Sequence, residues 1–173
     1  MSGPLGIEID SRTLAGVADA FERAPEAARR ELTMATWEAS LLLEREAKEN
    51  TPVGIGGGGG LKGSISAREP QVLAEGVIGM VSTPLSYAVP VEFGAKPHMP
   101  PVEPIKDWVE HKLAPAPEEV EGIAWAIAMT IKKEGTKGAH MFERAIHTTG
   151  PQVQRIFVDA MERLGDDIAR GAE

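Results

Sequence analysis

Residues 25–49 read PEAARRELTMATWEASLLLEREAKE, and this stretch decides the fold. Pro25 suits the first turn of a helix, where its missing N–H is not needed. Pro52 marks the end, because the residue before a proline is pushed out of the helical region. Between them, small and apolar residues recur at the helical spacings of three and four, at Ala28, Leu32, Ala35, Ala39 and Leu42. The sequence therefore predicts one long amphipathic helix in its N-terminal third.

The segments on either side of this helix predict a small sheet and further helices. Short strands are expected where apolar residues alternate with others, at 5–10, 61–68, 72–82 and 87–93. Pro90 has no N–H to donate, which favours an edge or a bulge for the last strand. Short helices are expected after Ser11 and at 104–113, then longer ones at 120–131 and from 142 to about 170, with Gly150 and Pro151 interrupting the last. The predicted fold class is α+β, with a small antiparallel sheet packed against the long N-terminal helix and C-terminal helices.

Length and charge predict one acidic domain. The chain has 173 residues and a net charge of −8, while residues 51–100 carry equal numbers of basic and acidic side chains. We expect a single domain over 1–173, with a core at about 5–100 and 138–170 and a helical insertion at about 102–137. The acidic balance argues against nucleic acid as the main partner. No apolar run has the length of a membrane span, and residues 1–10 lack the features of a secretory signal.

The glycine-rich stretch 54–60 contains a literal G-x-G-x-x-G at Gly54, Gly56 and Gly59. In a dinucleotide site such glycines follow a strand and open a helix. Here they follow the predicted long helix and lead into a strand, so no cofactor is expected. Two interpretations stay open: a flexible loop, or a loop that becomes ordered only against a partner.

No constellation of residues predicts catalysis or metal binding. The chain has no cysteine, which excludes disulfides, thiolate metal sites and cysteine nucleophiles. His140, Glu143 and His147 share a predicted helix, but the two histidines are separated by about 10.5 Å along its axis, too far for one ion. No Gly-x-Ser-x-Gly elbow is present. We therefore expect no metal site, no catalytic residues and no enzymatic activity.

Glu92 stands in an apolar stretch between Val91 and Phe93. Alternation along a strand would turn it toward solvent, opposite Phe93. It could instead pair with a basic residue across an interface. A role as general acid or base has no visible partner, so the first two interpretations stay open.

Three motifs resemble those of a known protein family. They are TPVGIGGGGGLKGSIS at 51–66, LSYAVPVEFGAK at 85–96 and GAHMFERAI at 138–146. The pattern is similar to that of the tail-completion, or head–tail joining, proteins found in the neck of long-tailed bacteriophages. The resemblance covers about 7–147, and the second motif is its most specific part. The matching residues are Thr51, Pro52, Val53, Gly60, Leu61, Ser64, Ile65, Tyr87, Ala88, Val91, Glu92, Phe93, Gly94, Phe142 and Ala145.

The resemblance implies a structural virion protein without catalysis. It implies a ring of identical subunits, with six-fold symmetry as the expectation, between the capsid connector and the tail tube. The expected partners are other copies of the chain and neighbouring neck proteins: the connector or stopper, and the tail terminator or tail tube. Genome DNA would pass through the lumen without sequence-specific binding, and no membrane partner is expected. The expected location is the virion, and the host cytoplasm during assembly.

We expect the contacts with subunits or partners in the glycine-rich loop, in the Tyr87–Phe93 segment and in the proline-rich link after it. The candidate interface residues are Val53, Ile55, Gly58, Leu61, Tyr87, Glu92, Phe93 and Met99. Two other functions remain as alternatives. One is a tail terminator or connector stopper, and the other is a soluble module that binds a small ligand through the glycine-rich loop.

Overall fold

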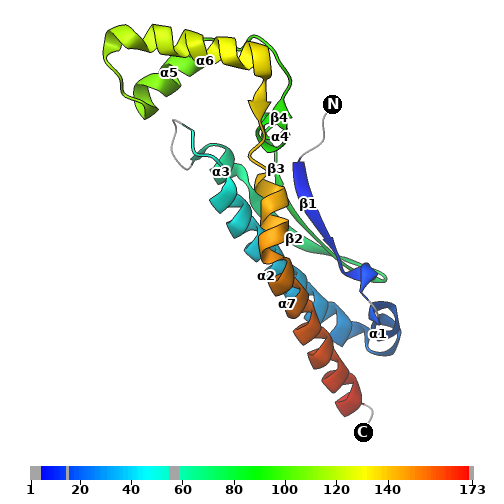
Figure 1. The fold of residues 1–173 in the computed structure, drawn as a ribbon. Helices are drawn as coiled ribbons and strands as arrows, with labels where there is room; N and C mark the ends of the chain where they lie inside the picture. Colours follow the sequence, from blue (N-terminus) through cyan, green and yellow to red (C-terminus); the bar gives the residue numbers. More distant parts are fainter. Residues whose placement is uncertain (1–4, 15, 55–58, 172–173) are drawn as a thin grey trace.

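A computed structural model describes residues 5–14, 16–54 and 59–171. The fold is α+β, as predicted, with a three-stranded antiparallel sheet and long helices at both ends of the chain (Figure 1). The sheet consists of β1 (Leu5–Asp10), β2 (Ser66–Leu73) and β3 (Gly76–Thr83) in the order β1-β3-β2. Both β1 and β2 are therefore edge strands.

Two long helices form the axis of the molecule. Helix α2 (Pro25–Asn50) runs against α7 (Met141–Gly171) in the opposite direction, and the sheet packs beside them (Figure 1). Small residues at the contact let the two backbones approach closely, and larger apolar side chains fill the space around them. The main core contains Ala28, Leu32, Ala35, Ala39, Val77, Ile156, Phe157, Ala160 and Leu164. The long helix predicted from Pro25 is confirmed over its whole length.

Short elements close this body at both ends. The turn η1 (Ser11–Thr13) and helix α1 (Val17–Arg23) connect β1 to α2 at one end. Helix α3 (Leu61–Ser64) and helix α4 (Ala88–Phe93) lie near the other end. A second cluster fills the core there, formed by Leu43, Ala47, Leu61, Ile65, Val81, Ala88, Met141, Phe142 and Ala145.

Gly79 brings the sheet close to α2. A Cβ at this position of β3 would lie 2.6 Å from both Ser40 Oγ and Thr36 Cγ2. Real Cβ atoms do not approach other heavy atoms so closely, so any larger residue would push the helix away from the sheet. The glycine at 79 therefore sets the distance between these two layers.

The strand predicted at 87–93 is wrong. The segment forms α4, in which Ala88 and Glu92 are buried at helical spacing while Phe93 is exposed. Pro90 falls in the first turn of this short helix, where backbone N–H groups have no intrahelical partner. The proline that suggested an edge strand is thus equally suited to a helix start.

Three smaller expectations also need correction. Residues 61–64 form helix α3 rather than the start of a strand. The hairpin turns at 74–75 instead of 69–71, and Pro70 lies within edge strand β2, where the register shifts between Arg68 and Gln71. Gly150 and Pro151 do not interrupt α7, because both halves of that helix bury apolar residues in the same body.

A helical hairpin extends from one end of the body (Figure 1). It consists of α5 (Glu103–Lys112), the turn η3 (Pro117–Glu119) and α6 (Val120–Glu134), and we call it the arm. A two-stranded ribbon, β4 (Gly94–Ala95) with β5 (Thr136–Lys137), joins the arm to the body. The arm has a core of its own, formed by Val109, Val120 and Ala124 with the half-buried Val102, Ile105, Ile123 and Ile127.

Candidate subunit interface

The structure separates the predicted contact residues into exposed and buried groups. Ile55 and Gly58 lie outside the described residues. Leu61 and Glu92 are buried within the subunit, so they do not offer a contact surface. The exposed residues are Val53, Tyr87, Phe93 and Met99, and Phe93 shows the largest exposed fraction, 63%.

Leu61 belongs to the core for a simple reason. It opens α3 directly after the glycine-rich stretch and packs in the cluster that also contains Leu43, Ile65 and Phe142. An apolar residue next to the glycine-rich stretch suggested a partner contact. In the structure it instead fixes the end of that stretch to the body.

Glu92 satisfies the first turn of α7. Its two carboxylate oxygens accept hydrogen bonds from the backbone N–H groups of Phe142 (3.1 Å) and Glu143 (3.2 Å). Such N–H groups have no partner inside the helix, and the N-terminal end of the helix dipole favours a negative charge. Neither interpretation from the sequence was right. Glu92 faces neither solvent nor a basic residue, because it caps a helix that begins fifty residues further along the chain.

Backbone contacts around Glu92 hold the base of the arm. The carbonyl of Val91 accepts from Ala139 N–H at 2.7 Å, and the carbonyl of Glu92 accepts from His140 N–H at 3.1 Å. Gly94 has φ +83°, and a Cβ there would lie 2.3 Å from the Thr136 carbonyl oxygen. The two chain segments that lead into and out of the arm are therefore joined tightly at this point.

His140 and Glu143 lie against each other at the start of α7, with Nδ1 and Oε2 2.7 Å apart. Within the part of the chain that the structure describes, no cluster of three or more His, Cys, Asp or Glu side chains could hold a metal ion. In the same part of the chain, no helix combines the length and the apolar character needed to cross a bilayer.

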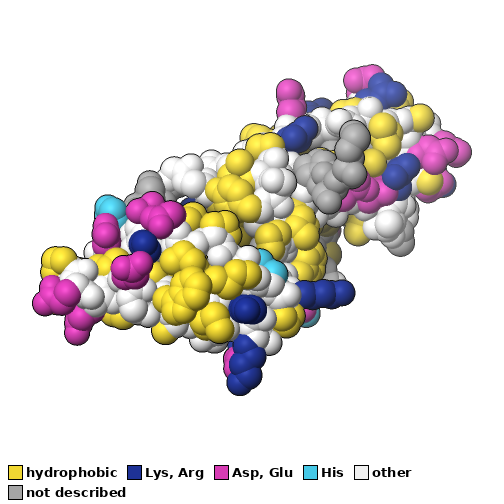
Figure 2. Space-filling model, turned by 90° about the horizontal axis from the view of Figure 1, so that it is seen from above, with side chains coloured by type: hydrophobic (Ala, Val, Ile, Leu, Met, Phe, Trp, Pro, Cys, Tyr) yellow, Lys and Arg dark blue, Asp and Glu magenta, His cyan; other side chains and the backbone are white. Residues whose placement is uncertain are grey.

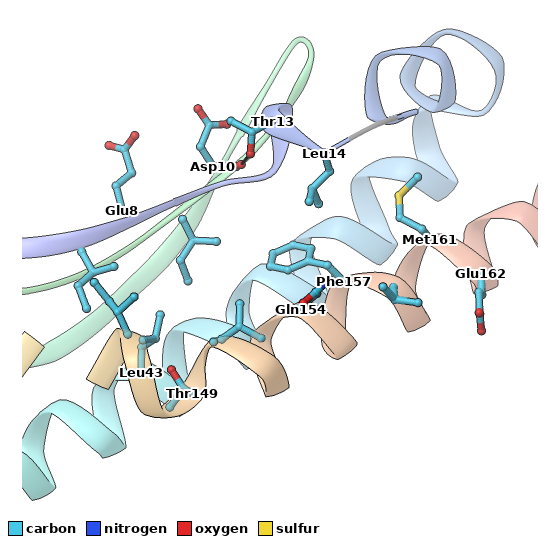
Figure 3. Close-up of a pocket in the computed structure, with 16 residues that line it drawn as sticks. Glu8, Asp10, Thr13, Leu14, Leu43, Thr149, Gln154, Phe157, Met161 and Glu162 are labelled. Atoms are coloured by element: carbon cyan, nitrogen blue, oxygen red, sulfur yellow. Dashed lines mark hydrogen bonds between the residues drawn. The ribbon is translucent and has the colours of Figure 1, made fainter. Parts of the chain in front are cut away.

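A hollow lies between the edge strand β1 and helix α7, and we call it the groove (Figure 3). Its volume is about 770 Å³. Figure 3 shows Leu14, Phe157 and Met161 pointing into the space between strand and helix. The apolar residues that line it are Ile7, Ile9, Leu14, Leu43, Ile146, Val153, Phe157, Val158 and Met161. Ile146 and Val158 remain about half exposed, so the groove is incompletely covered.

The charged side chains that line the groove are all acidic. They are Glu8 and Asp10 on β1 and Glu162 on α7, and Figure 3 shows them pointing outward at the two rims. Asp10 accepts hydrogen bonds from the Arg12 side chain, at 2.6 Å for the shortest, and these bonds together with one from Arg12 N–H lower the pKa of its carboxyl group. Arg12 also offsets the charge of Asp10, so Glu8 and Glu162 dominate the charge of the rims.

Two further surfaces expose large apolar side chains. One is the outer face of α2, where Met34, Trp37 and Leu41 follow one another at helical spacing. The other is the arm, where α6 exposes Trp125 and Met129. Figure 2 shows the molecule from above, with hydrophobic side chains gathered between Lys or Arg and acidic side chains. Exposed apolar patches of this kind mark interaction sites on soluble proteins.

The groove could not be predicted from the sequence, although one signal was present. The apolar residues of α7 cover more of its circumference than the contact with α2 requires, since Ile146, Val153 and Val158 lie beside the buried residues. That excess indicates a second contact face, but not its partner. Of the described residues next to the glycine-rich stretch, Val53, Gly54, Gly59 and Gly60 do not line the groove.

The fold defines a small α+β protein with an apolar groove on its body and a projecting helical arm. Comparisons with family models, with curated proteins and with solved structures give no match to this chain. Its function is therefore argued from these surfaces and from the sequence motifs.

Proposed function

We propose that the chain is a structural protein of the phage neck, a tail-completion or head–tail joining protein that forms a ring between the capsid connector and the tail tube. The observation that carries this proposal is the apolar surface left uncovered on separate elements, the groove on one side and the arm on another. A protein that assembles into a ring needs two different contact surfaces on each subunit.

Charge supports the same assignment. The chain carries a net charge of −8, and its ends are its acidic parts. A ring of such subunits would repel DNA phosphates, so a genome could pass through the lumen without binding to it. A lumen lined with Lys and Arg in the assembled particle would contradict this point.

The exposed part of the predicted interface fits contacts with neighbouring neck proteins. Tyr87, Phe93 and Met99 are exposed near the junction of body and arm, and Val53 is exposed just before the glycine-rich stretch. These four residues lie apart from the groove, so they are available to a different partner. A tail terminator or a connector stopper would use the same kinds of surface, and only the identity of the partner distinguishes these roles.

The test uses the phage genome that encodes this chain. Deleting the gene should leave filled capsids and finished tails that do not join, and adding the purified protein to that lysate should restore infectious particles. Electron microscopy shows the separated parts, and mass spectrometry of purified particles shows whether the protein is present. Infectious particles that lack the protein would overturn the proposal.

The volume of the groove supports a second candidate function, the binding of an apolar small ligand. Ligand pockets commonly measure about 300–1,000 Å³, and the groove falls within this range. Its site would be the β1–α7 groove and not the glycine-rich loop. Native mass spectrometry of the freshly purified protein would detect such a ligand as a constant mass addition, which Val158→Lys should remove.

A further inference from the structure

We propose that the groove of one subunit receives helix α6 from the arm of a second copy. This inference rests on the proposed assembly into a ring and names the contact that would build it. The occupant is a helix with an apolar face and basic edges, and the groove is an apolar channel with acidic rims.

The apolar parts of the two surfaces match. Helix α6 turns Val120, Ala124 and Ala128 inward, and it exposes Trp125 and Met129 about 100° around the helix from Ala124 and Ala128. These two side chains are one turn apart, and 52% and 42% of their surfaces are exposed. Large flexible and aromatic side chains of this type are the usual anchors of a protein interface.

The charged parts match as well. Lys132 and Lys133 follow Met129 by three and four residues, and both are exposed. They are about 100° apart around the helix axis, so they diverge to either side of Met129. In the groove, Glu162 lies at the Met161 end and Glu8 lies toward the other end, so the two adjacent lysines can approach Glu162 but not Glu8 at the same time (Figure 3). Lys133 also lies 3.9 Å from Glu134 at the helix end, a loose and exposed pair that a stronger partner could replace.

The lengths of the two elements agree. Helix α6 has 15 residues and is about 22 Å long. The part of α7 that lines the groove, from Ile146 to Glu162, is about 24 Å long. One helix can therefore fill the groove from end to end.

The positions of the charges set the orientation. Glu162 lies at the end of the groove that contains Met161, whereas Glu8 and Asp10 lie toward the end that contains Thr149, where the Arg12 side chain adds a positive charge (Figure 3). Placing Lys132 and Lys133 at the Glu162 end makes α6 run parallel to the α7 segment beneath it. In this register Met129 lies beside Val158 and Trp125 lies beside Gln154.

The arm and the groove of one subunit face different ways. In Figure 1 the arm extends to the upper left, whereas β1 lies on the right of the two long helices. The arm therefore reaches a neighbouring copy rather than its own groove. A contact between two different surfaces repeats head to tail, and it produces a ring if the rotation closes.

A single contact of this kind is weak. Sixteen residues line the groove, fewer than the roughly 20–30 per side of a standard interface. The free protein is then mainly monomeric in dilute solution. When several subunits assemble on the connector, they are already held close together. The contact between neighbours then forms at a high effective concentration and becomes stable. The test must therefore trap the contact covalently.

Disulfide trapping suits this chain because it contains no cysteine. Two single variants, Met129→Cys and Val158→Cys, are mixed at high concentration under mild oxidation, and the products are identified by peptide mass spectrometry. The M129C–V158C dimer should form about tenfold faster than either homodimer, because docking holds the two thiols together. Trp125→Cys with Gln154→Cys should behave in the same way. The double variant M129C/V158C should give a ladder of oligomers in place of dimers.

Two controls are built into the same experiment. Val72→Cys lies on the opposite edge strand, with 47% of its surface exposed, and should not form a preferred bond with M129C. Ile146→Cys lines the other end of the groove, so it is out of register with M129C. Equal trapping of M129C by V72C and V158C would overturn the proposal, as would a preferred V158C–V158C dimer. The second result would indicate two grooves packed face to face.

Charge reversal provides an independent readout. Lys132→Glu with Lys133→Glu should slow the M129C–V158C reaction several-fold, and so should Glu162→Lys. Combining the two reversals should restore most of the rate, since the attraction is then re-formed with opposite signs. Two reversals that are harmless singly and together would contradict the charge match.

The result is separable from the proposed function. If the protein is found in particles but the bond never forms, the neck assignment stands and the arm–groove contact is wrong. If the bond forms in pure protein but the protein is absent from particles, the contact stands and the neck assignment is wrong.

Discussion

The body and the arm differ in how they are stabilised. The body buries two extended clusters between α2, α7 and the sheet, whereas the arm has three buried residues in its single cluster. The arm also leaves Trp108, Leu113, Trp125 and Met129 exposed. Apolar area removed from water is the main source of stability, at roughly 25 cal/mol per Å². The comparison indicates that the body holds the fold, and that the arm depends on the body and leaves large apolar side chains exposed.

The largest expected effect on stability comes from a substitution in the core of the body. Leu164→Ala removes a side chain that is 1% exposed between α2 and α7. The lost burial and the cavity should lower the free energy of unfolding by about 2–5 kcal/mol. Chemical denaturation followed by circular dichroism measures this change.

Two matched variants sharpen the result. Val158→Ala removes a half-exposed side chain from the same helix and should change stability by less than about 0.5 kcal/mol. Val109→Ala, in the core of the arm, should raise hydrogen exchange in α5 and α6 while leaving the amides of α2 protected. Loss of protection throughout the body in Val109→Ala would show that arm and body unfold as one unit.

A smaller effect is expected at the junction of the two regions. Glu92→Ala leaves the backbone N–H groups of Phe142 and Glu143 without their partner, which should cost about 1–3 kcal/mol. Glu92→Gln keeps one acceptor oxygen and should cost less. Thermal melting should rank the parent protein as most stable, Glu92→Gln next and Glu92→Ala last. Hydrogen exchange should increase first at the start of α7 and in the ribbon β4–β5. A fully stable Glu92→Ala protein would mean that the cap contributes nothing.

Periodic segments were predictable, and the junction was not. The helix from Pro25 and the strand at 5–10 have regular apolar spacing over their whole length, and the structure confirms both. The stretch around Val89, Val91 and Phe93 also alternates, but it is six residues long in the structure and forms a helix. In so short a segment, alternation and helical spacing select overlapping sets of residues. The buried contacts of Ala88 and Glu92 decide between them.

The candidate interface was harder to predict than the helices and strands, because its residues come together only in the folded chain. The role of Glu92 requires a helix start that lies fifty residues away in the chain, so no local pattern could reveal it. The groove combines residues of β1 with residues of α7, which are at opposite ends of the sequence. Exposure of Phe93 and burial of Leu61 likewise follow from which neighbours the fold supplies. Spacing predicts which residues share a face, but not what covers that face.

The smallest expected effect is on the pH dependence of stability, and it also differs between the body and the arm. Glu31 is buried between α2 and α7, where the Arg163 guanidinium donates to it at 2.8 Å. This hydrogen bond is the main cause that lowers the pKa of Glu31; burial opposes it, and Arg30 adds to it. In the arm, Lys106 pairs with Glu103 and Glu121, whose side chains are more than 80% exposed, and exposed pairs of this kind contribute little.

A carboxyl whose folded pKa is depressed stabilises the protein above its unfolded pKa, and this contribution is lost as the pH falls through the folded value. Acidification should therefore weaken the body. Glu31→Gln should be less stable at neutral pH and should lose less stability between neutral pH and acid than the parent protein. Part of the slope should remain, because Glu44 also has a lowered pKa. Its burial acts in the opposite direction, but hydrogen bonds from Lys48 and Ala67 N–H outweigh it. Denaturation curves at several pH values measure both slopes, and identical slopes would show that the Glu31–Arg163 pair is not what makes the body sensitive to acid.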